Sequence, residues 1–202
     1  MDVENAVGSA HNDTLGSSNG DGTLWGLAGN DSLYGNGGND ILYGGIGDDS
    51  LYGQDGDDQL TGGAGADTLD GGAGYDTYIF ARGDGADVLS QIGADASGGL
   101  LDFGTAIASD QLWFTQTGND LLISVIGTSD AVTIDDFFGA GNREVTQLTA
   151  SGLALDSSTS TAAVQNLVSA MAAFSPPAPG QMDLDPSVRN DASVSAALAA
   201  WA

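Results

Sequence analysis

The sequence has no cysteine and no lysine, and its 202 residues include only three arginines and one histidine. The absence of cysteine excludes disulfides and thiolate metal sites. A single histidine, His11, is too few for an HExxH zinc site, and no phosphate loop of the GxxxxGK[ST] type occurs. We therefore expect no enzyme activity and no catalytic residue in this chain. No apolar run is long enough to cross a bilayer, so no transmembrane segment is expected.

Negative charge dominates the composition. Asp and Glu number 28 against three basic residues, and the formal net charge is −25. Disordered acidic tails favour Glu, Lys and Pro, whereas the excess here is of Asp and Gly, which suits tight turns and oxygen ligands for a hard cation. The charge repels nucleic acid and anionic membrane surfaces, so neither is expected as a partner. We expect a monomer.

A nine-residue period runs without a gap from Gly8 to Ile79. The eight units read GSAHNDTLG, SSNGDGTLW, GLAGNDSLY, GNGGNDILY, GGIGDDSLY, GQDGDDQLT, GGAGADTLD and GGAGYDTYI. Position eight is Leu in seven units, position one is Gly everywhere except Ser17, and position six is Asp everywhere except Gly22. The position-six residues are Asp13, Asp31, Asp40, Asp49, Asp58, Asp67 and Asp76. A constant period of this kind predicts a repeat architecture.

Each unit predicts a glycine-rich turn of six residues followed by a three-residue strand with one inward side chain. Two units then make one coil of 18 residues, and stacking places Leu33 between Leu15 and Leu51 in a thin apolar core. Carboxylates on successive coils would lie about 5 Å apart and repel one another. We therefore expect the block to be unfolded until divalent cations bind between the stacked Asp residues.

The units resemble the GGxGxDxUx nonapeptides of the RTX (repeats-in-toxin, haemolysin-type) family. This resemblance implies an all-β fold, a right-handed parallel β-roll with calcium ions in rows along the turns on both sides, about four to six ions in this chain. The resemblance implies six ligands for each ion. One turn supplies the carbonyls of positions two and four and the position-six carboxylate. The turn one coil later supplies the carbonyls of positions one and three and its own position-six carboxylate.

Carried onto this sequence, the implied ligand sets form two rows. One row holds Leu27, Gly29, Asp31, Gly44, Ile46 and Asp49, then Gly45, Gly47, Asp49, Gly62, Ala64 and Asp67. The other row holds Asn36, Gly38, Asp40, Gly53, Asp55 and Asp58, then Gln54, Gly56, Asp58, Gly71, Ala73 and Asp76. A weaker site pairs Asp13 with Asp31, and Gly22 removes a carboxylate from a site with Asp40. Asp87 or Asp84 could complete a terminal site above Asp67 after a local insertion.

Two simpler interpretations accompany these assignments. Asp is common in solvated turns, but turn preference does not enforce a period of nine. The aromatic residues at position nine, Trp25, Tyr34, Tyr43 and Tyr52, could form a sugar-binding strip, although packing in a ladder on the outer face of short strands explains them as well.

The chain divides into five parts: a lead-in at 1–7, the roll at 8–79, a β-rich capping flank at 80–155, a docking helix at 156–174 and a flexible tail at 175–202. Alternating runs such as DQLWFTQ and NDLLISVI predict an antiparallel cap over the open end of the roll. This flank resembles most closely that of the adenylate cyclase toxin-haemolysins. The resemblance implies that the tail is a secretion signal for a type I secretion apparatus.

These expectations define a calcium-binding module of a secreted, extracellular protein, unfolded at low calcium and folding outside the cell. Two alternatives remain open. One is a carbohydrate-binding module of a polysaccharide-modifying enzyme, and the other is a rigid spacer of an adhesin.

Overall fold

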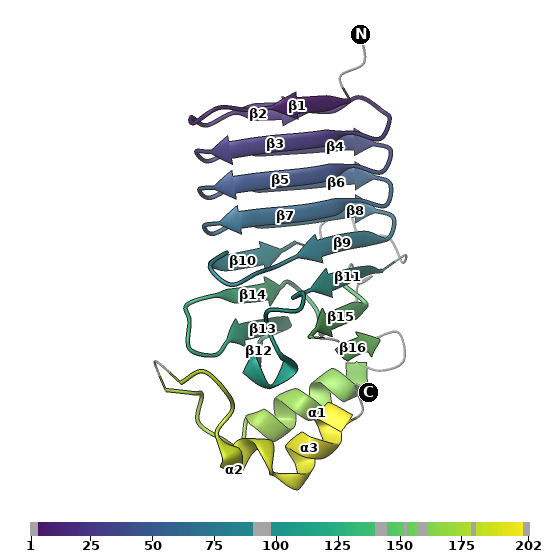
Figure 1. Ribbon diagram of the computed structural model, residues 1–202. Helices are drawn as coiled ribbons and strands as arrows, with labels where there is room; N and C mark the ends of the chain where they lie inside the picture. The colour runs from purple at the N-terminus through teal and green to yellow at the C-terminus, as the bar shows by residue number, and fades with distance from the viewer. Residues whose placement is uncertain are drawn as a thin grey trace.

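The computed structural model describes residues 4–90, 98–139, 145–151, 153–156, 161–178 and 181–199. Its repeat block is a stack of coils whose strands alternate between two sheets, with the N-terminus at one end and the helices at the other (Figure 1). The strands of the block are β1 (Asn5–Val7), β2 (Thr14–Gly16), β3 (Thr23–Ala28), β4 (Ser32–Gly37), β5 (Ile41–Ile46), β6 (Ser50–Asp55), β7 (Gln59–Ala64), β8 (Thr68–Ala73) and β9 (Asp76–Ile79). The architecture is the expected parallel β-roll.

Each strand pairs in parallel with the strand one coil away, since consecutive strands lie in opposite sheets. The register aligns Leu15, Leu33 and Leu51 in one sheet, which confirms the expected stacking. Leu24, Leu42 and Leu60 align in the other sheet. The leucines from Leu24 to Leu60 are fully buried. The central strands span six residues rather than the expected three, because pairing is interrupted only at position one and resumes at positions two and three.

The flank differs from the expected antiparallel cap. Its strands are β10 (Ala86–Leu89), β11 (Gly99–Asp102), β12 (Leu112–Thr117), β13 (Asp120–Val125), β14 (Ala131–Ile134), β15 (Gln147–Ala150) and β16 (Leu153–Asp156), with a short 3-10 helix η1 at Ser109–Gln111. β10, β11, β14 and β15 extend both sheets in parallel. Among the flank strands that the structure describes, the antiparallel pairs are β12–β13, β13–β14 and β15–β16.

The parallel stacking continues because residues beyond Ile79 keep the inward and outward alternation of the coils, although their spacing changes. Val88 and Leu89 pair with Thr68 and Leu69, two residues out of the nine-residue phase. Larger side chains enter the core there, among them Phe80 and Phe103, whose rings meet edge to face at 5.5 Å. The flank therefore fills the end of the roll with the bulky apolar side chains that the repeats lack.

The structure corrects two expectations at the C-terminus: a single helix and a flexible tail at 175–202. The expected helix is shorter, α1 at Thr161–Met171, and two further helices follow, α2 at Pro186–Arg189 and α3 at Ala192–Ala199. Asp185 caps α2, where it accepts a hydrogen bond from the Ser187 backbone N–H at 2.8 Å, and Val194 of α3 is fully buried. The small residues of this segment hid the helices from a periodicity search.

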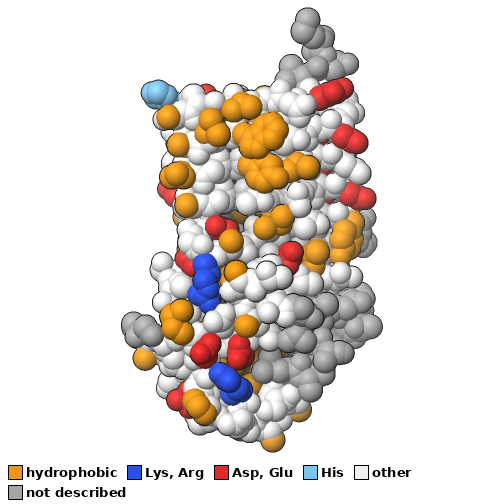
Figure 2. Space-filling view, viewed as in Figure 1, with side chains coloured by type: hydrophobic (Ala, Val, Ile, Leu, Met, Phe, Trp, Pro, Cys, Tyr) orange, Lys and Arg blue, Asp and Glu red, His pale blue; other side chains and the backbone are white. Residues whose placement is uncertain are grey.

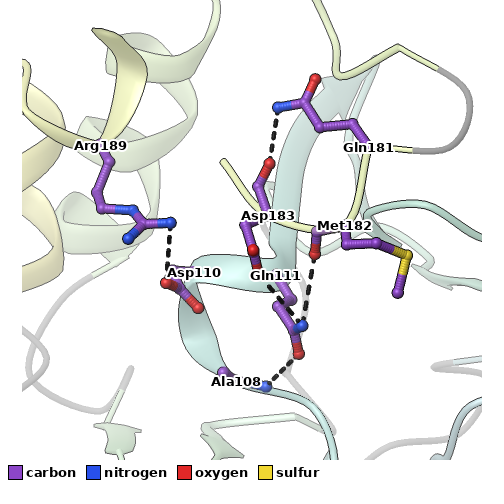
Figure 3. A network of polar contacts seen from close by, with 7 residues as sticks. All are labelled: Ala108, Asp110, Gln111, Gln181, Met182, Asp183 and Arg189. Carbon is purple, nitrogen blue, oxygen red and sulfur yellow. Dashed lines mark hydrogen bonds and ion pairs between the residues drawn. The ribbon is translucent and has the colours of Figure 1, made fainter. Parts of the chain in front are cut away.

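Polar contacts fasten the segment before α2 to η1 (Figure 3). The Leu184 N–H donates to the Asp110 carbonyl at 3.1 Å, and the Gln111 side chain donates to the Met182 carbonyl at 3.4 Å. Arg189 pairs with the Asp110 carboxylate at 3.4 Å. The described part of the C-terminal segment is thus docked onto the cap. No helix within the described residues is long and apolar enough to span a membrane.

Candidate metal sites in the turns of the roll

The position-six carboxylates form ladders along the roll. Those of Asp31, Asp40, Asp49, Asp58, Asp67 and Asp76 are buried at 0 to 2% exposure. In each, Oδ1 accepts a hydrogen bond from the backbone N–H of the residue 18 positions earlier, at 2.7 to 2.9 Å. The backbone of one coil therefore orients the carboxylate of the next.

The second carboxylate oxygen is the unusual atom. Oδ2 is buried and has no hydrogen-bond partner in Asp31, Asp40, Asp49, Asp58 and Asp67. A buried charged oxygen without a partner is strongly destabilising, and native proteins rarely leave one unpaired. The repeat block contains no lysine or arginine that could pair with these oxygens. An oxygen-binding cation fits this arrangement.

A backbone carbonyl from the next coil lies beside Oδ2 of Asp31, Asp40, Asp49 and Asp58. The position-one glycines locate it: a Cβ built on Gly35 would lie 2.7 Å from Asp40 Oδ2 and 2.6 Å from the Gly53 carbonyl oxygen. A Cβ on Gly26, Gly44 or Gly53 would likewise touch a position-six Oδ2 and the position-one carbonyl one coil later. Position one must therefore be glycine wherever position six is Asp, because a side chain would fill the space between the two oxygens.

The turn carbonyls of positions two and four point along the roll toward the next coil. A Cβ on Gly45 or Gly63 would collide with the position-two carbonyl one coil earlier, and a Cβ on Gly47 or Gly56 with the position-four carbonyl. This orientation requires left-handed backbone at position two, where Leu27, Asn36 and Gln54 have φ of 82°, 69° and 80°. Such values are strained for residues other than glycine, and strain of this kind clusters at ligand sites.

Burial sets the protonation behaviour of the ladder. Removal from water raises the pKa of Asp49 to about 6 and that of Asp58 and Asp67 to about 7. The backbone N–H of the preceding coil lowers each pKa, and carboxylates in neighbouring coils raise it again. Burial also raises the pKa of Asp40. These four carboxyl groups therefore hold a proton more tightly than usual when no cation is bound.

The structure brings together the residues of the four main expected ligand sets, which lie in turns one coil apart and paired in register. It also places Asp87 where the sequence suggested, above Asp67. The spacing is 20 residues rather than 18, yet the Asp67 N–H donates to Asp87 Oδ1 at 3.1 Å. Burial and the neighbouring carboxylates of Asp67, Asp84 and Asp130 raise the pKa of Asp87 to about 8.

Asp13 differs from the other position-six residues. Its Oδ2 accepts hydrogen bonds from the Ser9 backbone N–H at 2.6 Å and the Ser9 hydroxyl at 2.9 Å, and it lies near the solvent-exposed start of the roll. The oxygen that is unpaired elsewhere is already satisfied here.

Sequence reasoning missed a second ladder, at position five. The side-chain oxygens of the following residues each accept a hydrogen bond from the backbone N–H 18 residues later, at 2.7 to 3.1 Å: Asn12, Asp21, Asn30, Asn39, Asp48 and Asp57. Asn or Asp at position five in six of the eight units is the signal that would have revealed it. This exposed ladder joins the turns of successive coils without a cation.

The position-nine aromatics stack in pairs on the outer faces. Trp25 lies over Tyr43 with ring centroids 6.1 Å apart, and Tyr34 over Tyr52 at 5.1 Å. Figure 2 shows hydrophobic side chains gathered on one such face of the roll, with acidic side chains along its edge. The ladder interpretation of these residues matches the stacking.

The donor set is made only of oxygen atoms: one carboxylate from each of two turns, together with backbone carbonyls. Within the described ranges, no cluster of three or more His, Cys, Asp or Glu side chains could hold a metal. Sites with two carboxylates and several carbonyls suit calcium, which accepts six to eight oxygen ligands in flexible geometry. Fold and turns together thus define a β-roll with candidate calcium sites.

Comparison with known proteins identifies the repeats. Residues 16–51 and 43–78 match the RTX calcium-binding nonapeptide repeat family, and the repeat block of this chain belongs to that family. Among solved structures, extracellular lipase LipA from Serratia marcescens is 20% identical, with a TM-score of 0.32 over 64% of this chain. This chain covers 37% of the lipase chain. The AlgE6R3 subunit of the Azotobacter vinelandii mannuronan C5-epimerase is 19% identical, with a TM-score of 0.35 and 88% coverage of both chains.

Proposed function

We propose that this chain is the calcium-responsive folding module of a secreted protein. The observation that carries the proposal is the row of buried position-six carboxylates, in which Oδ2 of five residues has no hydrogen-bond partner: Asp31, Asp40, Asp49, Asp58 and Asp67. Calcium between successive turns would neutralise these oxygens and tie neighbouring coils together. When bound, it would supply the electrostatic attraction that the aspartate-rich turns lack.

The proposed ligands are the four sets in the two rows, each with a position-six Asp from two successive turns. Asp49 and Asp58 belong to two sets each, so each would serve two neighbouring ions. Asp87 would close the row that contains Asp67. With the terminal positions included, four to six ions remain the proposed number per chain.

Calcium would also decide when the module folds. Extracellular calcium modules bind with dissociation constants of about 0.1 to 1 mM, far above cytosolic calcium. The chain would therefore stay unfolded inside the cell and fold outside it, where binding to the folded form shifts the equilibrium. This behaviour suits export through a type I apparatus, which would read the C-terminal segment before it docks onto the cap.

Docking of the C-terminal segment supports an order of events. Leu184, Val188 and Val194 are buried in the folded form, so a recognition signal within this segment would be hidden after folding. A carbohydrate-binding role has less support, because the repeat block has no lysine or arginine to hold an acidic polysaccharide.

Circular dichroism with and without calcium tests the proposal. We expect little β signal in EGTA and a cooperative gain at millimolar calcium. Asp49→Asn keeps the oxygen that accepts the Asp31 N–H but removes the charge, and it should raise the calcium midpoint several-fold. Asp48→Asn removes the same charge from the exposed neighbouring position and should leave the midpoint nearly unchanged. A β signal that is unaffected by EGTA would refute calcium-dependent folding.

A further inference from the structure

Unit two, residues 17–25, departs from the pattern at two positions at once. It has Ser17 where the other units have glycine at position one, and Gly22 where they have Asp at position six. The unit therefore gains a side chain at one end of its turn and loses one at the other. Ser17 follows β2 in the first coil and lies against β4 of the second coil.

The Ser17 hydroxyl lies among three oxygen atoms. Its Oγ is 2.6 Å from the Gly35 carbonyl oxygen, 3.2 Å from Asp40 Oδ1 and 3.0 Å from the Ser18 carbonyl oxygen. These atoms are a position-two carbonyl of the same turn, with a position-one carbonyl and a position-six carboxylate from the turn one coil later. They are three of the six ligand types of the proposed calcium sites.

The two departures are complementary in space. A Cβ on Gly22 would lie 2.9 Å from Ser17 Cβ and 3.0 Å from Asp40 Oδ1, and it would also meet the backbone carbonyl oxygen of Glu4, so an aspartate here requires the lead-in strand to shift as well. The same exclusion operates in the regular coils, where a Cβ on Gly35 would lie 2.7 Å from Asp40 Oδ2. A turn can therefore hold a side chain at position one or a carboxylate at position six, but not both without displacement.

We propose that the Ser17 hydroxyl takes the place of a calcium ion at this junction between the first and second coils. This assignment rests on the proposed calcium sites of the regular coils. A hydroxyl carries its own proton, and the 2.6 Å separation directs that proton to the Gly35 carbonyl. With Gly22 in this turn, the junction has one carboxylate where the regular sites have two, which weakens its attraction for calcium.

This hydrogen bond determines where one of the two calcium rows begins. The row that contains Asp40 starts at the site shared by Asp40 and Asp58, and a hydrogen bond closes the turn before it. The contact between the first and second coils at this junction therefore does not depend on the calcium concentration. The first coil can stay joined to the second through the serine while the later coils respond to calcium.

Counting the bound ions in paired variants tests the assignment. Ser17→Gly combined with Gly22→Asp restores the repeat pattern and should add one calcium ion per chain, measured by native mass spectrometry and by isothermal titration. Gly22→Asp alone keeps Ser17 in the way and should add none. Ser17→Ala should leave the ion count unchanged but speed amide hydrogen exchange in the first coil.

Each result decides between the alternatives. Loss of one ion in Ser17→Ala would show that the hydroxyl is a calcium ligand and would overturn the assignment. A folded double variant with no additional ion would overturn it as well, and circular dichroism in calcium establishes folding. A wild-type chain that binds no calcium would refute the proposed function itself, whereas an unchanged count across all variants of a calcium-binding chain would refute only the role of Ser17.

Discussion

Acid should partly replace calcium in folding this chain. The buried position-six carboxyls have raised pKa values in the folded form, about 6 for Asp49 and about 7 for Asp58 and Asp67. An unfolded Asp has a pKa of about 3.9. Between these values the folded form holds protons that the unfolded chain releases. Stability without calcium is therefore greatest below about pH 4 and falls as the pH rises toward 7.

The slope follows from the number of carboxyls involved. Each group that is protonated only in the folded form contributes about 1.4 kcal/mol per pH unit. Three such groups give a slope of up to about 4 kcal/mol per pH unit near pH 5, where all three are protonated in the folded form and ionised in the unfolded chain. A neutral carboxyl can also donate its proton to the carbonyl that lies beside Oδ2, such as that of Gly71 beside Asp58.

The assay is a pH titration of the full chain in EGTA, followed by far-ultraviolet circular dichroism. We expect β signal to appear as the pH falls from 7.5 to 4.5. Asp58→Asn removes one titrating group and should flatten the transition. Asp57→Asn removes the same charge from the exposed position five, keeps the oxygen that accepts the Tyr75 N–H, and should change the slope little.

Calcium should compete with these protons. Binding at pH 6.5 should release protons, which isothermal titration detects as a dependence of the heat on the buffer's ionisation enthalpy. Two results together would refute the conclusion that these carboxyls are buried and protonated in the calcium-free folded form. The chain would gain no β structure on acidification, and calcium binding would release no protons.

Two further substitutions test the space and the core of the roll. Gly35→Ala puts a methyl group between Asp40 Oδ2 and the Gly53 carbonyl oxygen and should weaken calcium binding at least tenfold, measured by isothermal titration. Gly20→Ala is the control, because no atom lies within 4 Å of its new Cβ, and it should leave calcium binding unchanged. Equal effects of the two substitutions would contradict the geometry. Leu42→Ala removes a fully buried side chain from the apolar core. It should lower the free energy of unfolding by about 2 to 5 kcal/mol, measured by urea titration in calcium. A change below about 1 kcal/mol would mean that the core is not closely packed there.

The period of nine made the roll predictable because it fixes both chemistry and register. Asp recurs every nine residues, and Leu follows it two residues later. Both sets of side chains can occupy equivalent places in every coil only if the coils stack in phase, which pairs Leu33 with Leu51. The extent of pairing was not predictable. Strand pairing continues on both sides of the interruption at position one, and the left-handed backbone of Leu27 at position two is not visible in its residue type.

The flank and tail were harder to predict for a different reason. Alternating apolar residues reveal strands but not their partners, so β10 and β14 were expected in an antiparallel cap and in fact pair in parallel. The insertion that shifts Asp87 from 18 to 20 residues after Asp67 hides the continuation of the coil. In the tail, Ala and Ser provide little contrast between the faces of α3, and tertiary contacts determine its helix.

The direction of the carboxylate ladder gives the two ends of the roll different roles. Each buried Asp is oriented by a backbone N–H of the preceding coil, so the order in one coil depends on the coil before it. Asp13 has no such coil before it, and Ser9 satisfies its carboxylate instead. At the other end, the N–H of Asp67 orients Asp87, which belongs to β10 of the flank. The flank therefore supplies the last carboxylate of the ladder as well as an apolar end to the core. Loss of the Asp87 carboxylate should disturb the roll as well as the cap, because the ladder crosses the boundary between them.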